Sequence, residues 1–162
     1  IFTSILPLAI YLLMIFLPKI DPKKSSYLKH KKAYEITKVI IVLFMIIMNW
    51  IIIMVALGFN INVGMIVRIL VGLLFIMIGN YMSQIRQNYF FGIKTPWTLA
   101  NETVWKKTHR VGSFSFLIGG LILITTSFLR GTLGFISLIT AIVIVVFFPI
   151  IYSFIEYKKI SK

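Results

Sequence analysis

The amino-acid sequence predicts an all-α protein, a polytopic transmembrane helix bundle with five spans. Hydrophobic residues make up 59% of the 162 residues, and the mean hydropathy is +0.99. These residues fall in long runs that contain almost no charge, which is typical of helices that cross a bilayer. Lysine and arginine gather between the runs instead. A β-barrel is disfavoured, because its strands would alternate apolar and polar residues.

Five apolar runs are long enough to be spans, and we expect them to form a single transmembrane domain over residues 1–162. A helix needs about 17–25 apolar residues to cross the hydrocarbon. The first run ends at Pro18 and lies at the short limit of that range. The predicted spans are residues 1–17, 36–57, 63–82, 111–129 and 133–152.

The connections alternate between short turns and long basic loops. The turns at 58–62 and 130–132 contain Gly or Asn, which tolerate unusual backbone angles. The loops at 18–35 and 83–110 are rich in Lys and Arg, as is the C-terminal tail. The positive-inside rule therefore predicts that both loops and the C-terminus are cytoplasmic and that both turns are outside.

The first residue is Ile1, already inside an apolar run. With the predicted orientation this end would be outside the cell. A cytoplasmic N-terminus would require an odd number of further spans upstream, and one is the simplest number. We therefore expect six spans in the full-length protein.

The charge balance is strongly basic, with 17 Lys and Arg against 4 Asp and Glu and a formal charge of +13. In a soluble protein this balance would suggest nucleic acid as the partner. Here the basic residues lie between spans, so anionic lipid headgroups and topology explain them. We expect the lipid bilayer as a partner and no direct contact with nucleic acid. The absence of cysteine excludes disulfides and thiol catalysis.

Two features within the spans predict how the helices pack. Pro149 lies inside the last span, where it would remove one backbone hydrogen bond and kink the helix. Small residues let helices approach closely in lipid, so we expect the third and fourth spans to pack through them. These small residues are Gly72 and Gly79 on one span and Gly112, Ser115 and Gly119 on the next.

The segment from Asn88 to Gly112 differs from the rest, because it is polar, aromatic and long. The stretch 92–97 is typical of a turn, since Pro96 biases Thr95 towards an extended backbone. A long connection of mixed composition between spans usually has a function.

A helix is predicted to follow this turn. Asn101 can cap its N-terminus, and Glu102 has the charge favoured in a first turn. Spacings of three and four place four residues on one face of this helix, which continues into the fourth span. They are Trp105, Thr108, His109 and Gly112. Trp97 and Trp105 are expected in an aromatic belt at the headgroup level.

The same segment resembles a family signature. Gly92-Ile-Lys-Thr-Pro-Trp-Thr-Leu is followed by Glu102 and then by Val104-Trp-Lys-Lys-Thr-His-Arg-Val-Gly112. This is similar to the pattern G-I-[RK]-T-P-W-T-L, then V-W-x-[RK]-T-H-R-x-G, of the SdpI family of bacterial membrane proteins. The likeness covers about residues 81–119, and the entry into the first basic loop at 17–22 is also similar. The motif residues are Asn88, Gly92, Ile93, Lys94, Thr95, Pro96, Trp97, Thr98, Trp105, Thr108, His109, Arg110 and Gly112.

The resemblance implies an immunity and signal-transduction protein of the bacterial cell membrane, with no catalytic step and no cofactor. Such a protein protects its cell against a secreted antimicrobial peptide. It can also hold an ArsR-type repressor at the membrane. The outer turns and helix ends would then meet the peptide, and the motif loop would dock the repressor or relay a conformational change.

Two other classes of function stay open. An enzyme could use His109 with Glu102 as a general base, although no metal-binding or catalytic motif is present and His30 lies among lysines that would repel a metal. A transporter or channel would need ionisable residues inside its spans. Arg68 alone meets that condition, near the predicted outer end, where it could contact an anionic ligand or simply reach the interface. Asn49 and Asn80 are polar but uncharged, and each could form a hydrogen bond to a neighbouring helix.

Overall fold

The computed structural model describes residues 2–160, with side chains from residue 4 onward, and every regular element in that part of the chain is helical. The fold class is therefore all-α. The elements are α1 (Phe2–Ile20), α2 (Lys24–Lys29), α3 (Lys31–Ala56), α4 (Val63–Met82), α5 (Pro96–Ala100), α6 (Glu102–Thr125), α7 (Gly131–Ile142), η1 (Val143–Phe147) and α8 (Phe148–Ile160).

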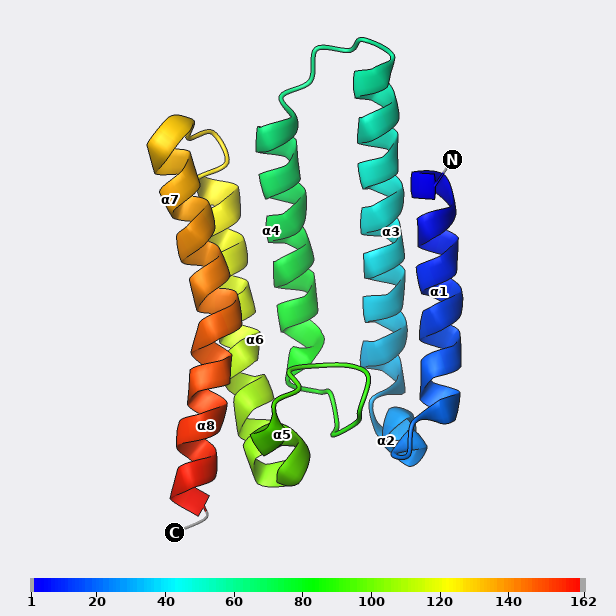
Figure 1. Cartoon of the computed structure of the whole chain (residues 1–162), viewed down its shortest axis with the longest axis vertical. Coiled ribbons are helices and arrows are strands. Elements are labelled where there is room, and N and C mark those ends of the chain that lie inside the picture. The colour runs from blue at the N-terminus through cyan, green and yellow to red at the C-terminus, as the bar shows by residue number, and fades with distance from the viewer. Residues whose placement is uncertain (1, 161–162) are drawn as a thin grey trace.

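The long helices run side by side along one axis (Figure 1). α1 packs against α3, α3 against α4, and α4 against α6. α6 also packs against the continuous helix formed by α7, η1 and α8. The short helices α2 and α5 both lie at one end of the bundle, α2 beside α3 and α5 beside α6, and we call this the basic end (Figure 1). The turn between α3 and α4 lies at the opposite end.

Four of the five predicted spans lie in helices that are long and apolar enough to cross a membrane: α3, α4, α6 and the continuous stretch Gly131–Ile160. The first run forms a shorter apolar helix over Ser4–Ile20, so a fifth span is not shown. Large apolar side chains face outwards along these helices; Trp50 and Phe135, for example, are 61% and 62% exposed. Exposed apolar surface on this scale fits a multi-pass membrane protein in contact with lipid.

At the basic end, several helices extend beyond the apolar runs that predict them. α3 begins at Lys31 rather than at residue 36, and α8 continues to Ile160 rather than ending at residue 152. α6 begins at Glu102, before the apolar run at 111, as the predicted cap at Asn101 requires. Hydropathy marks the part of a helix that contacts lipid, whereas backbone hydrogen bonding and packing decide where the helix starts. The predicted loop 83–110 is therefore a connection over 83–95 followed by α5 and the first turns of α6.

The first helix continues through Pro18 to Ile20, where the sequence predicts an end. A proline inside a helix lacks the N–H that would bind the carbonyl four residues earlier. That carbonyl belongs to Met14, and the hydroxyl of Tyr34 donates to it at 2.6 Å. A side chain of α3 thus supplies the missing hydrogen bond and joins the two helices.

The sequence predicts a kink at Pro149, and the structure has a π-helical turn over Val143–Phe147, between α7 and α8. In a regular α-helix the ring of Pro149 would clash with the carbonyl of Val145, four residues earlier. The wider π-helical turn includes Val145 and relieves this clash. The helix therefore accommodates Pro149, which is itself buried, without ending.

The third and fourth spans pack through small residues, but not only those expected. A Cβ on Gly72 of α4 would lie 2.7 Å from the carbonyl oxygen of Gly120 on α6. Ser113 of α6 donates to the carbonyl of Gly79 at 2.7 Å. Gly119 instead faces Val145, since its Cβ would lie 2.3 Å from that side chain. The expectation that Gly119 packs on the third span is therefore wrong; it lets the last helix approach α6.

Candidate functional site

The motif segment contains the short helix α5 where the sequence predicts part of a turn. Thr95 has an extended backbone, with φ −118° and ψ 160°, as Pro96 predicts. Its hydroxyl accepts from the backbone N–H of Thr98 at 3.2 Å, and the Thr98 hydroxyl accepts from the N–H of Thr95 at 2.9 Å. This reciprocal capping box, with Pro96 in the first helical turn, starts α5. The Thr-Pro-x-Thr spacing is a signal that could have predicted this helix.

The second helix of the segment starts as predicted. The side chain of Asn101 accepts from the N–H groups of Thr103 and Val104 at 2.8 and 3.1 Å. Glu102 lies in the first turn and forms an ion pair with Lys106 at 2.9 Å. The cap fixes where α6 begins and so sets the direction of the four-residue face that follows.

Those four residues, Trp105, Thr108, His109 and Gly112, are all buried. Trp105 is 0% exposed and donates from Nε1 to the carbonyl of Ile85 at 2.9 Å. The expectation that Trp105 belongs to an interfacial aromatic belt is therefore wrong. The segment before α5 folds over the indole and takes it out of contact with lipid and water.

His109 is fixed by bonds at both ring nitrogens. Its ring stacks on Trp105 with centroids 4.1 Å apart. Nε2 accepts from the backbone N–H of Ile93 at 3.0 Å, so this nitrogen carries no proton. Nδ1 lies 2.9 Å from the carbonyl oxygen of Trp105 and is therefore the donor. The ring is a neutral imidazole that ties the loop to α6, and neither nitrogen is available to a substrate in this arrangement.

Gly92 is the point at which the loop backbone meets this stacked pair. Its φ is +114°, in the region that favours glycine. A Cβ there would lie 2.4 Å from Nε2 of His109 and 3.2 Å from the Trp105 ring. Both the backbone angle and the close contact require glycine at this position.

The motif segment is also joined to the last helix. The hydroxyls of Thr95 and Ser153 lie 3.1 Å apart. The ring of Trp97 packs against Phe154, with centroids 4.9 Å apart. Lys107 forms an ion pair with Glu156 at 2.5 Å.

A buried polar hub, formed by Asn88, Tyr27 and Asp21, connects the motif segment to the first basic loop. Asn88 is one of the predicted motif residues, but its contact with Tyr27 was not predicted. Asn88, 0% exposed, accepts from the N–H of Phe91 at 2.7 Å and from the hydroxyl of Tyr27 at 3.1 Å. That hydroxyl also lies 3.0 Å from a carboxylate oxygen of Asp21, which accepts from the N–H of Tyr89 at 2.9 Å. Burial, followed by the bond to Asp21, raises the pKa of Tyr27. The two basic loops thus form one folded unit, and nothing in their spacing along the chain indicated it.

His30 belongs to the same unit. It is 4% exposed, and its Nδ1 accepts from the backbone N–H of Arg86 at 3.2 Å. Burial lowers the pKa of His30, and the charge of Arg86 adds to this effect, while a backbone hydrogen bond with Ser26 opposes it. Within residues 4–160, no group of three or more His, Asp or Glu could hold a metal ion.

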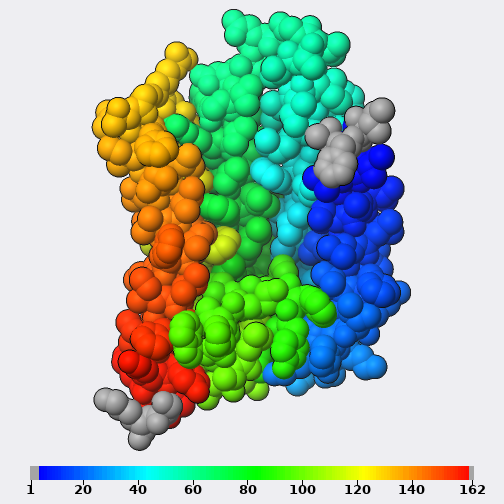
Figure 2. Space-filling view, in the orientation of Figure 1, coloured from blue at the N-terminus to red at the C-terminus, as the bar shows by residue number. Residues whose placement is uncertain are grey.

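The remaining motif residues divide between the interior and the surface. The side chain of Ile93 packs against Gly112, where an added Cβ would lie 2.4 Å from its Cδ1 atom. Thr108 is buried, and its hydroxyl has no hydrogen-bond partner among the described residues. Lys94 and Arg110 are exposed, and Lys94 reaches back to the carbonyl of Phe90 at 3.3 Å. Figure 2 shows the motif segment, in green, filling the front of the basic end between α2 and α8.

Arg68 lies away from the motif, near the other end of α4. Its Nη1 donates to the carbonyl of Leu129 at 2.8 Å and more weakly to that of Thr126 at 3.4 Å. These carbonyls follow the end of α6, where backbone acceptors lack partners within the helix. Arg68 therefore holds the connection to α7, and a contact with an external ligand would have to share this group.

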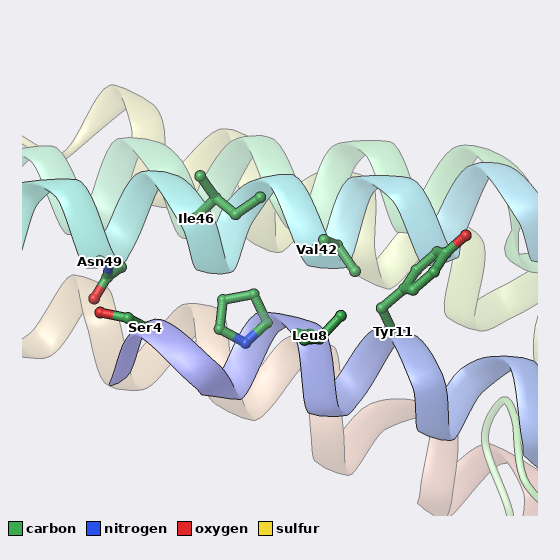
Figure 3. Close-up of a pocket in the computed structure, with 7 residues that line it drawn as sticks. Ser4, Leu8, Tyr11, Val42, Ile46 and Asn49 are labelled. Carbon is green, nitrogen blue, oxygen red and sulfur yellow. The ribbon is translucent and has the colours of Figure 1, made fainter. Parts of the chain in front are cut away.

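A groove between α1 and α3 is the second candidate region, on the half of the bundle away from the motif. Its volume is about 490 Å³. Figure 3 shows Ser4 and Asn49 turned towards each other across it, with Leu8 and Tyr11 further along α1. The side-chain oxygen of Asn49 is buried and has no hydrogen-bond partner among the described residues. The groove is thus mostly apolar, and the polar side chains of Ser4, Tyr11 and Asn49 could fix the orientation of a ligand that binds in it.

Comparison with known proteins assigns the segment that contains the motif residues to a protein family. Residues 84–153 match the model of the SdpI/YfhL protein family. A relative from Bacillus subtilis (strain 168), called Immunity protein SdpI, is 32% identical over 108 residues, which cover 67% of this chain and 52% of that protein. The chain thus spans about half the length of the curated relative that it matches. No solved structure matches it.

The matched segment begins just before Asn88 and ends at Ser153, so it includes all the motif residues and the part of the last helix up to the Thr95–Ser153 contact. On the evidence of this segment and of its homology to an immunity protein, the chain belongs to the SdpI/YfhL protein family.

Proposed function

We propose that this protein is an immunity protein of the bacterial cell membrane, which protects its cell against a secreted antimicrobial peptide without a catalytic step. The observation that carries the proposal is the 32% identity to Immunity protein SdpI. The geometry of the motif supports it. The residues that an enzyme would need free for chemistry, His109 above all, are bonded to backbone groups inside the protein.

In this proposal the basic end faces the cytoplasm, as the positive-inside rule favours. The opposite end would then meet the peptide from outside. That end offers the turns at 58–62 and at 130, the guanidinium of Arg68, and the groove beside Asn49. A peptide that acts in the membrane could place apolar residues in the groove and form hydrogen bonds with the side chains of Ser4 and Asn49.

The motif cluster would serve as a relay. Its hydrogen bonds join the connection after α4 to α6 and α8, and its polar hub adds the segment that carries Tyr27. A shift of one helix would therefore move the exposed part of the motif loop, where Lys94 lies. This surface is where an ArsR-type repressor would dock.

The test is protection of a sensitive cell. The full-length protein is expressed, the cells are challenged with candidate killing peptides, and survival is compared for wild type, Asn49→Leu and Lys94→Ala, with membrane levels checked by a fused tag. Asn49→Leu should lose protection at an unchanged level. Lys94→Ala should keep protection and release the repressor, measured as reporter expression.

Survival that does not depend on the protein would remove the immunity role. Survival with both variants as in wild type would leave that role intact but overturn the proposed contact at the groove. Ser137→Leu, a small polar residue replaced on α7 outside the groove, is the matched control for Asn49→Leu.

A further inference from the structure

Two cavities on the surface of the basic end are adjacent and share Arg86 and Lys106. One has a volume of about 320 Å³ and lies between α2, the connection after α4, and the start of α6. The other, of about 450 Å³, continues along α6. We call the two together the basic cleft. Its charged residues are Lys23, Lys29, Arg86, Lys106 and Arg110, with Glu102 as the single acid.

The positive charge of this cleft is not balanced by the protein. Glu102 is paired with Lys106, and Lys23 donates to the side chain of Gln87. Among the described residues, no salt bridge joins Arg86 or Arg110 to a carboxylate. Two guanidinium groups thus line one cavity, and guanidinium groups bind phosphate oxygens in a bidentate manner.

The cleft is continuous with the apolar surface of α6. The helix has an exposed stripe at spacings of three and four that changes from charged to apolar: Glu102, Lys106, Arg110, Phe114, Ile118 and Leu121. Phe114 lines the cleft and is 59% exposed. The step from Arg110 to Phe114 is one turn, about 6 Å along the helix. The cleft therefore lies where charged surface gives way to surface that contacts acyl chains.

We propose that the basic cleft binds the headgroup phosphate of an anionic phospholipid such as phosphatidylglycerol or cardiolipin. Arg86 and Arg110 bind the phosphate, and an acyl chain runs over Phe114 and Ile118. A basic pocket at the end of membrane helices suits an anionic headgroup. The apolar wall at Phe114 favours a lipid over a soluble phosphate or an acidic protein segment, neither of which would cover it. The inference does not depend on a role in immunity.

The experiment measures lipid binding to the purified full chain in a neutral detergent. Phosphatidylglycerol is titrated, and the rise in unfolding temperature is followed, because a ligand that binds only the folded state stabilises it. Phosphatidylcholine and glycerol 3-phosphate are titrated in parallel. We expect a rise with phosphatidylglycerol alone, and native mass spectrometry should retain the lipid on the protein.

The variant Arg86→Gln/Arg110→Gln should weaken this binding by about fivefold for each charge removed. Its matched control, Lys24→Gln/Lys32→Gln, removes two exposed charges outside the cleft and should bind as wild type does. Arg110→Lys keeps the charge and should bind more tightly than Arg110→Gln, which also serves as the test if the double variant fails to fold. An equal loss in the control pair, or no loss in the Arg variants, would overturn the proposal. An equal stabilisation by glycerol 3-phosphate would assign the cleft to a soluble phosphate instead.

Discussion

The two ends of the bundle are built differently. At the basic end, side chains from the first basic loop, the motif segment, α6 and α8 are joined by buried hydrogen bonds through Asn88, Trp105, His109 and Thr95. At the opposite end, short turns connect the helices, and Arg68 is the side chain that bonds to the end of a neighbouring helix.

This difference has a physical reason. Helices in lipid gain little from burying more apolar surface, because acyl chains are equally apolar. Close packing of small residues and polar contacts must therefore hold them. The basic end uses a polar cluster for this purpose, and a substitution there should cost more stability than a similar one at the opposite end.

The largest effect is expected for Gly92→Ala. The added Cβ would lie 2.4 Å from Nε2 of His109, and the backbone has a φ of +114°. Overpacking and the unfavourable angle together should destabilise the protein by about 3 kcal/mol. Thermal or denaturant unfolding in detergent measures this.

The control for this variant is Gly58→Ala. Gly58 lies at the opposite end and has a φ of +88°, but a Cβ there has nothing within 4 Å. It should show the cost of the backbone angle alone, about 1 kcal/mol. An equal loss in both variants would show that contact with His109 is not what requires glycine.

Asn88→Ala should have the next largest effect. It leaves the N–H groups of Phe90 and Phe91 without their acceptor, at 3.0 and 2.7 Å in the folded protein. An unsatisfied buried group costs about 1–3 kcal/mol. Because both hydrogen bonds are part-buried, each N–H should cost an amount near the lower end of that range, and we expect a total loss of about 2–3 kcal/mol. Unfolding in detergent again provides the measurement. Asn62→Ala, which removes an exposed helix cap at the opposite end, should cost about 1 kcal/mol; the reverse order would contradict the comparison.

Tyr34→Phe should have a smaller effect. The hydroxyl of Tyr34 donates to the Met14 carbonyl, which Pro18 leaves without its usual partner. Its removal should cost about 1–2 kcal/mol while the ring packing is retained. The control is Tyr11→Phe, which removes the hydroxyl of an exposed tyrosine on α1. The unfolding temperature of this variant should equal that of wild type. If Tyr34→Phe were also without effect, the bond would contribute nothing to the folded state.

The smallest effect concerns pH. Because the pKa of His30 is lowered in the folded state, the stability that this residue contributes is fully present above the unfolded value of about 6.5. It is lost as the pH falls through the folded pKa, since the unfolded chain binds the proton first. The comparison variant is His30→Asn, in which the amide oxygen can accept the backbone N–H of Arg86 and does not titrate. The unfolding temperature of wild type should therefore fall more than that of His30→Asn between pH 7 and pH 5, and parallel curves would contradict this.

The sequence predicted the features of the site that depend on neighbouring residues better than those that depend on residues far apart in the chain. The cap at Asn101 and the extended Thr95 depend on neighbouring residues, and both were predicted. The shared face of Trp105 and His109 follows from helical spacing, but its burial does not. Whether that face meets lipid or protein depends on a loop more than ten residues earlier, and the sequence alone placed Trp105 at the interface.

By itself, the sequence determined that the protein is helical and membrane-spanning, because long runs without charge can satisfy their backbone groups in lipid only as helices. It also determined the family, because the motif residues are adjacent in the chain. Only the tertiary structure decided that the two basic loops form one unit around Asn88 and that Gly119 faces the last helix. The reason is that hydropathy reports the solvent around a helix, whereas hydrogen bonds between residues 60 or more apart depend on how the chain folds back on itself.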